Sequence, residues 1–551
     1  MLDEAQLKRI PDPQTRHLVQ QLANLLEQAL TDTDGLRAEV QRLKDEINRL
    51  KGEQGKPHVK PSKPAPAATD PSSDHSSEQP RKRPATWKKG AKNHRIVVTR
   101  TQTVRLDPAT LPSDALFKGY ERVVVQNLRL TPDNVTFERA KFYAPSTGKT
   151  YLAPLPPGYT GGFGPDLRAL MLSLHHVGNV SQPALHTLLT HAGIVISSGQ
   201  VNNLLVAGHE RFHHEKQAIG RAGLASSPWQ QTDDTATRVD GVNHHAHVLT
   251  NPLYTTYTTL PRKDRLSVLR VLHNAAPLSF VLNADVLASQ TVRALPHKTQ
   301  RALSQQLADT RGDEAWARAL LSTTRVSLSA SATKSVLEAM ALAAYRTQNE
   351  VPVVDLLVCD DAPQFVGLTA ELALCWVHDA RHYQKLTPPL AVYRQILTRF
   401  QEAYWAYYDR LLAYRKEPTP AARAALSAEF DALFVADTGY GHLDYRIGQT
   451  LANKTKLLAV ISHPELPLHN NASELAVRRR VRKRDVSFGP RSACGVTAWD
   501  TFQSLAATAQ KLGVSFLAYL LDRVSERNAL PSLASVITER ARELHLGASW
   551  A

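Results

Sequence analysis

Cysteine is scarce in this sequence of 551 residues, which contains only Cys359, Cys375 and Cys494. So small and odd a number excludes a disulfide framework and is typical of a reducing cytoplasm. No uninterrupted apolar run approaches the roughly 18 residues that indicate a membrane span. The N-terminus also lacks a basic start followed by an apolar stretch, so we expect a soluble cytoplasmic protein.

Acidic residues are also in deficit, because 51 Asp and Glu face 66 Lys and Arg, a net charge of +15. Two segments hold most of the excess: 56–95 has ten basic and three acidic residues, and 478–491 has seven basic and one acidic. Such concentrated charge favours a polyanionic partner, with nucleic acid the leading candidate. A solvated tail explains the first segment equally well.

The first 51 residues predict a helical coiled coil. Leu36, Val40, Leu43, Ile47 and Leu50 alternate steps of four and three with charged residues between them. An earlier leucine set at 18, 22 and 25 has the same spacing, and we expect the segment 32–35 to break or kink the helix between the two sets. The alternative is an amphipathic helix packed on its own domain.

The next two segments lack long periodic patterns. Residues 52–95 are rich in Pro, Ser, Lys and Ala, which predicts a disordered basic linker. Residues 96–160 hold short β-prone stretches at 122–125 and 135–137 with a turn between them, which predicts a small β-rich module.

Residues 161–225 show three helical patterns, at 167–174, 181–192 and 198–215, with Ser181 and Ser198 at N-cap positions. The tight turn before the last pattern is typical of a helix-turn-helix. Its last helix would present Gln200, Asn202 and Asn203 to DNA base edges. A three-helix connector without DNA contact fits the pattern equally well.

From residue 226 to 485 the pattern predicts an α/β domain. Strand-like runs at 230–239, 244–250 and 254–260 form a meander, a helix follows at 262–272, and 353–358 is an apolar run suited to a central strand. That order is typical of a ribonuclease H-like core. Helical insertions interrupt it at about 275–350 and 388–462, and we expect a C-terminal helical region over 486–551.

Three acids fall at matching points of this fold. Asp233 lies along the first strand, Asp360 ends the next central strand, and Glu474 lies on a later N-capped helix. Clustered carboxylates are the ligands that Mg²⁺ prefers. Two such ions can activate a hydroxyl and stabilise a leaving oxygen in phosphoryl transfer. Isolated acids at element ends are also common caps, so the order of the three acids is what favours a metal site.

Three segments resemble motifs of the transposases of insertion sequence family sixty-six: 233–241 (DDTATRVDG), 375–381 (CWVHDAR) and 470–474 (NNASE). The resemblance implies a DDE transposase in which Asp233, Asp360 and Glu474 bind two Mg²⁺ or Mn²⁺ ions. It further implies cutting and joining of double-stranded DNA at terminal inverted repeats by a homodimer or higher oligomer, associated with the nucleoid. Asp234 stands where the family usually has Glu. Family members often carry a cysteine-rich zinc knuckle, but no cysteine precedes Cys359 here.

Further residues near these acids fit the same activity. Trp376, His378 and Arg381 are expected to support the site, with Cys375 and His378 lacking the second ligand pair of a zinc site. Trp376 is expected in the core, with base stacking as the alternative. The basic run after Glu474 predicts DNA backbone contacts, against the alternative of a solvated face. Its members are Arg478, Arg479, Arg480, Arg482, Lys483 and Arg484.

Two other functions compete with this interpretation. His209, Glu210 and His213 have the spacing of a zinc metalloprotease site. A nonenzymatic, dimeric DNA-binding regulator would explain the charge and the N-terminal half, but not three acids in ribonuclease H order.

Overall fold

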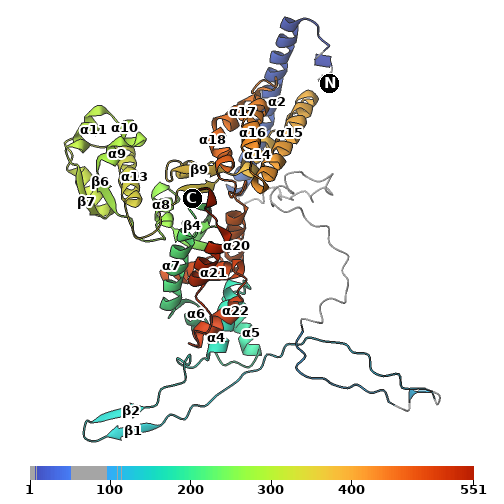
Figure 1. Cartoon of the computed structure of the whole chain (residues 1–551), viewed down its shortest axis with the longest axis vertical. Helices are drawn as coiled ribbons and strands as arrows, with labels where there is room; N and C mark the ends of the chain where they lie inside the picture. Colours follow the sequence, from blue (N-terminus) through green and yellow to red (C-terminus); the bar gives the residue numbers. More distant parts are fainter. Residues whose placement is uncertain (1–5, 8, 51–95, 108–109, 113–114, 551) are drawn as a thin grey trace.

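The computed structural model describes residues 6–7, 9–50, 96–107, 110–112 and 115–550. It is a mixed α/β structure with a central body, a lobe on one side, a long N-terminal helix beside a group of helices, and an extended arm (Figure 1). The predicted linker at 52–95 lies outside the described residues. No helix in the described ranges is long and apolar enough to cross a membrane.

A five-stranded sheet forms the centre of the body, in the order β5-β4-β3-β8-β9. Strands β3, β4 and β5 pair antiparallel, whereas β8 and β9 run parallel to β3. The predicted meander and the predicted central strand are therefore confirmed. Their bounds are Trp229–Val239 (β3), Val242–Thr250 (β4), Thr255–Leu260 (β5), Leu356–Cys359 (β8) and Glu371–Leu374 (β9).

Helices from distant parts of the chain pack on this sheet. Val248 and Tyr257 of the sheet share one apolar cluster with Ala476 and Ala507, which come from two late helices. The bounds of the helices around the sheet are Arg265–Leu272 (α8), Trp376–Gln384 (α14), Asn471–Ser487 (α20), Ala493–Lys511 (α21), Phe516–Val524 (α22), Leu533–Leu544 (α23) and Ala548–Trp550 (η4); η3 spans Pro363–Phe365.

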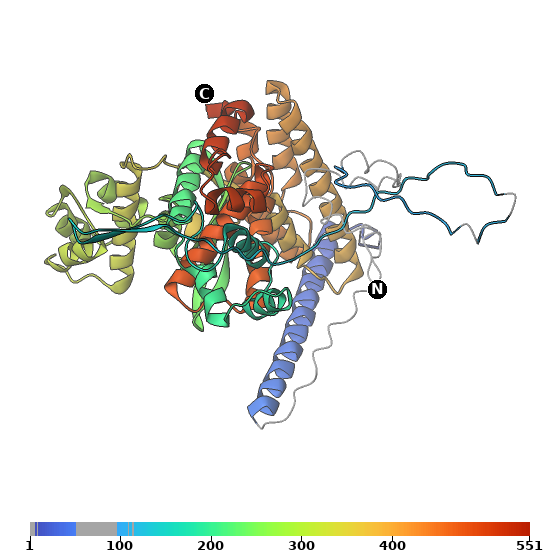
Figure 2. The ribbon, with the colours of Figure 1, turned by 90° about the horizontal axis from the view of Figure 1, so that it is seen from below.

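Two insertions interrupt the sheet, as predicted, and the first is not purely helical. It projects as a separate lobe in Figures 1 and 2 and contains a two-stranded sheet of β6 (Phe280–Leu282) and β7 (Ala308–Gly312). Its helices are Ala284–Ala288 (α9), Gln290–Arg293 (α10), His297–Ser304 (α11), Glu314–Ser322 (α12) and Ala330–Arg346 (α13). The second insertion is helical, with Ala391–Lys416 (α15), Pro420–Leu433 (α16), Gly441–Ala452 (α17), Lys454–Leu457 (α18) and Ala459–Ser462 (α19).

The N-terminal helix α2 is continuous over Pro13–Leu50, so the predicted break at 32–35 is wrong. Hydrogen bonds within the helix satisfy the polar side chains of this segment. Thr33 donates to the Ala29 carbonyl (2.7 Å), and Gln28 donates to Asp32 (2.8 Å). Such bonds let Thr and Asp residues remain inside a helix.

The two sides of α2 have different roles. Its Asn24 side chain bonds the backbone at Gly439 and Gly441, and Glu27 accepts the Leu390 amide, so a polar side docks on the second insertion. The predicted leucine seam remains exposed over the described side chains, from Leu18 (58% exposed) to Leu43 (48%).

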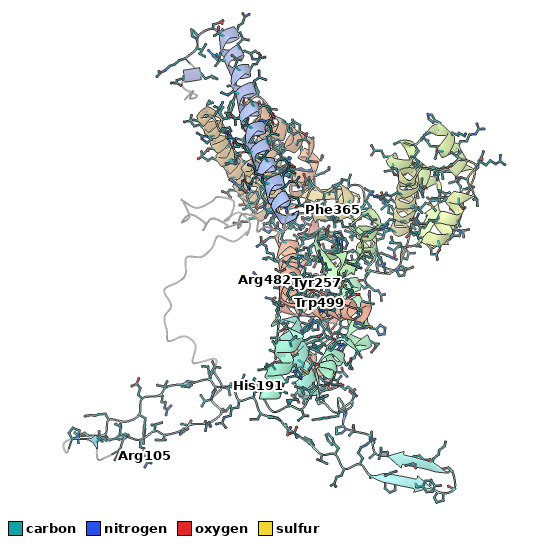
Figure 3. All side chains as sticks on the ribbon, turned by 180° about the vertical axis from the view of Figure 1, so that it is seen from behind. Arg105, His191, Tyr257, Phe365, Arg482 and Trp499 are labelled. Carbon is teal, nitrogen blue, oxygen red and sulfur yellow. The ribbon has the colours of Figure 1, made fainter. Side chains whose placement is uncertain are left out.

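Among the described residues of 96–160, the chain forms one hairpin and no larger sheet. Strands β1 (Lys141–Ala144) and β2 (Lys149–Leu152) pair antiparallel. The strands predicted at 122–125 and 135–137 are not formed. Val123 and Val125 are 77% and 79% exposed, so these β-prone residues find no packing surface that would stabilise a strand. In Figure 3, Arg105 lies on this extended arm, far from Tyr257 and Trp499 in the body.

The helices of 161–225 agree with the prediction except at one boundary. They are α4 (Pro165–His176), α5 (Gln182–His191), α6 (Ser198–Val206) and α7 (Glu210–Ala225). The third pattern is therefore two helices, because the chain turns at Gly208, whose φ is +72°. Ser181 is an N-cap as predicted, whereas Ser197, and not Ser198, caps α6.

Candidate active site

The register of the sheet places Asp233 and Asp360 at the same level on neighbouring strands. Gln231 of β3 pairs with Val358 of β8 in parallel, and each aspartate lies two residues further along its own chain. Adjacent strands are about 4.8 Å apart, and residues two apart share a face. Asp360 therefore follows the carboxyl end of β8, and Asp233 lies at the same level within the longer strand β3.

The same register shows which face Asp233 occupies. Its partner across the antiparallel pair is Val248, and Val248 packs against Ala476 of α20. Directly opposite residues of an antiparallel pair point to the same side. Asp233 therefore faces α20, the helix whose first turn carries Glu474.

The start of α20 is fixed to the sheet by hydrogen bonds around Asn470. Its side-chain amide donates to the Thr232 carbonyl (2.7 Å), and its backbone amide donates to the Cys375 Sγ (3.3 Å). Tyr257 of β5 donates to the Ala476 carbonyl (2.9 Å) one turn later. These bonds hold Glu474 between the sheet and α14.

The Glu474 carboxylate points to α14. Arg381 Nη2 lies 3.2 Å from Glu474 Oε2, and His378 Nε2 lies 3.7 Å from Oε1. Arg478, one turn later on α20, lies 3.6 Å from Oε2. The structure therefore brings His378 and Arg381 to Glu474, as predicted for supporting residues.

The opposite side of α14 is fixed to the second insertion. Asp379 pairs with Arg446 of α17, and it accepts hydrogen bonds from Thr450 (3.0 Å) and Tyr404 (3.1 Å). Trp376 is fully buried and its Nε1 donates to the Leu457 carbonyl (2.9 Å). The core-packing interpretation of Trp376 thus agrees with the structure, whereas base stacking is incompatible with its burial.

Burial dominates the electrostatics of the two aspartates. Burial, together with the charges of Asp360, Asp234 and Glu474, raises the pKa of Asp233 to about 7, although a backbone hydrogen bond from Asp234 opposes the shift. Burial also raises the pKa of Asp360, which the amide of Ala362 and the charge of His378 partly oppose. The carboxylates are thus close enough to interact, and a cation between them would relieve their repulsion.

The polar groups around these acids fit a divalent metal ion. Buried oxygens of Gln231 and Asn470 lack a hydrogen-bond partner among the described residues, as does Nδ1 of His378. Buried polar groups are normally satisfied by protein or by ordered water. Together with three carboxylates, such oxygens provide the setting in which Mg²⁺ or Mn²⁺ and its water ligands bind.

The three predicted catalytic acids do not form the tightest group of potential ligands. Within the described ranges, the group of His, Cys, Asp or Glu ligand atoms that all lie within 4.8 Å of one another is Cys375, His378 and Glu474. Asp233 and Asp360 share the face of the sheet but are outside that group. Glu474 therefore contacts α14 directly, while its charge still acts on Asp233 from the first turn of α20.

Asp234 faces away from this site and forms a cluster that sequence reasoning missed. His245 Nδ1 and Lys263 Nζ each lie 4.0 Å from Asp234 Oδ1, and Gln364 Nε2 lies 3.4 Å from Oδ2. The alternation of side chains along β3 gives the signal, because neighbours on a strand point to opposite faces. The Lys263 ammonium and the His245 ring near its carboxylate distinguish Asp234 from Asp233.

Comparison with known proteins decides the family. Residues 344–498 match the family model described as "Transposase IS66 family". The chain is also 31% identical over 339 residues to the "Uncharacterized protein y4jO" of Sinorhizobium fredii (strain NBRC 101917 / NGR234), which covers 58% of this chain and 99% of that protein. The chain belongs to the IS66 transposase family. The resemblance drawn from the three motifs is confirmed.

The family match covers only part of the candidate site of this IS66 transposase family member. Asp360, α14 and Glu474 lie inside residues 344–498, whereas Asp233 precedes them. No solved structure matches the chain.

The basic run of this IS66 family member divides between the surface and the interior. Arg478, Arg479 and Arg482 are exposed, and Arg484 is half-buried against the Ala236 carbonyl. Arg480 and Lys483 are 1% and 0% exposed, so the structure contradicts the prediction that they contact DNA. A helix exposes only one side when it packs on a sheet, and these two positions point inward. Figure 3 labels Arg482 beside the body, near Tyr257 and Trp499.

The residues predicted to read DNA bases lie on α6. Asn202 and Asn203 are exposed and Gln200 is half-buried, so all three are accessible in part. Asn202 accepts a hydrogen bond from Gln182 at the start of α5 (3.0 Å).

The histidines of the metalloprotease pattern are engaged elsewhere. His209 precedes α7, is buried, and contacts the Leu204 carbonyl through Nε2 (3.1 Å). His213 Nδ1 lies 2.8 Å from Thr501 Oγ1. Because these rings already bond to protein groups, His209, Glu210 and His213 do not form the open zinc site of a protease.

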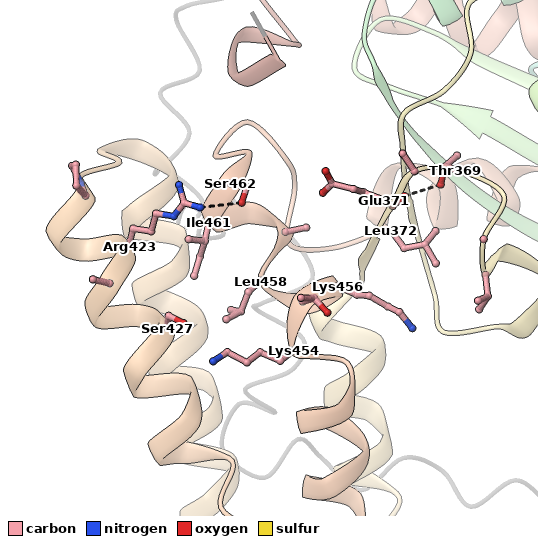
Figure 4. Close-up of a pocket in the computed structure, with 17 residues that line it drawn as sticks. Thr369, Glu371, Leu372, Arg423, Ser427, Lys454, Lys456, Leu458, Ile461 and Ser462 are labelled. Atoms are coloured by element: carbon pink, nitrogen blue, oxygen red, sulfur yellow. Dashed lines mark hydrogen bonds between the residues drawn. The ribbon is translucent and has the colours of Figure 1, made fainter. Parts of the chain in front are cut away.

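A large cavity of about 830 Å³ lies away from the acids (Figure 4). Ala370, Glu371 and Leu372, at the start of β9, contribute to its lining, together with Arg423 and Lys454 from the second insertion. Asp360 follows the opposite end of the neighbouring strand β8. This cavity is therefore separate from the candidate active site.

Proposed function

We propose that this protein is a DDE transposase with a ribonuclease H-like core, which cuts and joins DNA at the terminal inverted repeats of its element. The proposal rests on the positions of Asp233 and Asp360. They lie at the same level on neighbouring parallel strands, and the helix that carries Glu474 packs over them. The order of three antiparallel strands followed by two parallel strands supports the same fold.

Asp233, Asp360 and Glu474 would hold two Mg²⁺ or Mn²⁺ ions, which supply an activated hydroxyl and stabilise the leaving oxygen of the phosphodiester. The protein's own residues prepare this site in two ways. Because Asp233 is buried beside other carboxylates, a bound cation would stabilise its ionised form. Arg381 and His378 hold the Glu474 side chain, and Asp379 holds α14 in place through the second insertion.

DNA binding is proposed for two exposed surfaces. Arg478, Arg479 and Arg482 follow Glu474 on α20, with Arg484 at the edge, and their charges would contact the phosphate backbone near the scissile bond. Gln200, Asn202 and Asn203 would contact bases from α6, in a helix-turn-helix-like arrangement of α5 and α6. Such binding would associate the protein with the nucleoid.

A homodimer or larger assembly is proposed through α2. Its exposed leucines continue with four-and-three spacing, which is the pattern of a coiled-coil seam. Because the docked side of α2 uses Asn24 and Glu27, the seam can pair with a second copy while the helix stays on its own domain.

The test is cleavage of DNA fragments that carry the element's own ends. We expect purified protein to release a 3′-hydroxyl in Mg²⁺ or Mn²⁺, and Asp360→Asn to bind the ends while losing cleavage. Asp361→Asn is the matched control, because Asp361 is exposed and lies 3.7 Å from His382. Equal cleavage by wild type and Asp360→Asn would contradict the proposal. End binding without any metal-dependent cleavage by wild type would favour a nonenzymatic, dimeric DNA-binding regulator.

A further inference from the structure

Cys375, His378 and Glu474 form a mixed ligand group beside the candidate active site. One potential ligand atom from each side chain lies within 4.8 Å of the other two. Cys375 is the N-cap residue of α14, His378 lies in the first turn of that helix, and Glu474 lies in the first turn of α20. The third ligand therefore comes from a segment almost a hundred residues away in the sequence, so the group is a product of the tertiary structure.

Backbone contacts hold the two halves of this group together. The Asn470 amide, just before α20, donates to Cys375 Sγ at 3.3 Å. The Cys375 amide donates to the Cys359 carbonyl at the end of β8 (3.1 Å). Cys375 is 1% exposed, whereas the side chains of His378 and Glu474 are 25% and 14% exposed. The group thus has a buried sulfur at its base and is open to solvent at its other two ligands.

The chemistry of these ligands selects a different ion from that of the three acids. Sulfur, imidazole nitrogen and a carboxylate oxygen are the ligands of Zn²⁺, which takes three protein ligands and a water in open sites. Mg²⁺ prefers oxygen ligands and binds thiolate poorly. We propose that Cys375, His378 and Glu474 form a Zn²⁺ site that competes with the catalytic site for Glu474.

The competition follows from the shared carboxylate and rests on the proposed function. When Zn²⁺ binds, the Cys375 thiol loses its proton to the buffer and the three side chains close around the ion. Glu474 is then withdrawn from Asp233 and Asp360, so Zn²⁺ inhibits metal-dependent cleavage. Arg381, 3.2 Å from Glu474, must give up its contact and therefore opposes Zn²⁺ binding.

The experiment measures Zn²⁺ binding to the purified full-length protein, stripped of metals, by competition with a chromophoric chelator. We expect Cys375→Ser and His378→Gln each to weaken binding by about 100-fold or more, since even outer-shell changes cost 10–100-fold. Arg381→Gln should strengthen it, which general damage to the site would not do. Co²⁺ should give a thiolate charge-transfer absorption band that Cys375→Ser removes.

Matched controls separate this site from the other metal-binding side chains, because the chain has 22 histidines. Cys494→Ser removes an exposed thiol and His213→Gln a half-buried imidazole, both outside the group. We expect both controls to bind Zn²⁺ as wild type does. If Cys375→Ser does not fold, as judged by circular dichroism, the half-exposed His378→Gln and the Co²⁺ band of wild type still decide the matter.

Three results are distinguishable. Tight Zn²⁺ binding that depends on Cys375 and His378, together with inhibition of cleavage, supports the site and the shared role of Glu474. Binding that leaves cleavage unchanged supports the site and contradicts the proposed role of Glu474 in catalysis. Absence of binding, or equal binding by Cys375→Ser, overturns the Zn²⁺ site and leaves the proposed transposase activity intact.

Discussion

The first turn and the middle of α20 provide opposite surroundings for buried charge. In its first turn, Glu474 lies near Asp233, and burial together with the charges of neighbouring carboxylates raises the pKa of both Asp233 and Asp360. Nearly two turns later, the buried charge of Arg480 is balanced by an acidic partner and by hydrogen bonds. It pairs with Asp500, bonds Gln503 and Thr259, and lies 5.2 Å from the centre of the Trp499 ring.

The difference separates a functional charge from a structural one. A buried charge with good partners stabilises packing only as long as its partners remain. A buried charge without a partner costs stability, and sites of this kind are where ligands bind and pKa values are perturbed. We therefore expect opposite results when the two kinds of charge are removed.

The largest effect is expected for Asp233, whose buried charge lies beside other carboxylates. Asp233→Asn should lower cleavage on the order of 1,000-fold, because a metal ligand contributes several kcal/mol to phosphoryl transfer. In metal-free buffer at neutral pH the same change should raise the free energy of unfolding by about 1 kcal/mol or more, because it removes a buried, repelled charge.

Asp234→Asn is the matched control for this change. Asp234 lies next to Asp233 but on the other face, beside His245 and Lys263. Its neutralisation should not stabilise the protein, because it removes the negative charge that faces the Lys263 ammonium. DNA cleavage and urea unfolding are measured for both variants. The comparison would be contradicted if Asp234→Asn were more stable, and Asp233→Asn less stable, than the wild type.

The next largest effect is expected for Arg480, whose buried charge is paired with Asp500. Arg480→Met should lower the free energy of unfolding by about 3–5 kcal/mol, because it leaves Asp500 buried without its partner. Arg479→Met, at the exposed neighbouring position, should change it by less than about 0.5 kcal/mol. Urea denaturation followed by circular dichroism measures both, and similar stabilities would show that the buried pair is not structural.

A smaller effect is expected for the exposed arginines of α20. Changing Arg478, Arg479 and Arg482 together to Gln should weaken DNA binding and reduce the slope of log affinity against log salt by about 3, one unit per lost phosphate contact. A fluorescence-anisotropy titration at several salt concentrations gives the slope. An equal change for the exposed set Arg293, Lys298 and Arg301 in the first insertion would assign the effect to overall charge.

The smallest effect concerns pH and Lys483. Burial, with a smaller contribution from the charge of Arg480, lowers the pKa of Lys483 to about 7. The unfolded chain keeps this lysine protonated up to about pH 10.4. Between these values the unfolded state binds more protons, so the stability of the wild type rises with pH.

Lys483→Met should remove this part of the pH dependence. From about pH 7.5 to pH 8.5 the wild type should gain about 1 kcal/mol relative to the variant, close to the limit for one proton. Arg482→Met, on the exposed side of α20, should keep the wild-type pH dependence. Urea midpoints at both pH values give the comparison, and parallel curves for wild type and Lys483→Met would contradict it.

Much of the core could be predicted from local patterns. The three runs before residue 261 alternate or are broken by turns, and their bounds agree with β3, β4 and β5 within a few residues. Where the prediction was wrong, residue propensity alone did not decide the local structure. The helix α2 continues through 32–35 because side chains bond along the helix, and the β-prone stretch at 122–125 forms no strand because no partner strand lies beside it.

The candidate site could be predicted only in part. The order of Asp233, Asp360 and Glu474 along the chain is visible in the sequence, and so is the spacing of Cys375 and His378. The sequence does not show that Glu474 also lies with Cys375 and His378. That placement depends on where α20 begins over the sheet, which the bonds of Asn470 decide.

Local sequence by itself determined the order of the strands and helices, the family motifs and the presence of acids next to a basic run. Periodicity and turn residues act over a few positions, so they are readable without any contact between distant segments. Only the tertiary structure decided which side of each element is covered. It turned Asp233 inward and Asp234 to the other face, and it buried Arg480 and Lys483 while leaving Arg479 exposed. The physical reason is that a charge becomes structural or available according to the segment that packs against it, and that segment lies far away in the chain.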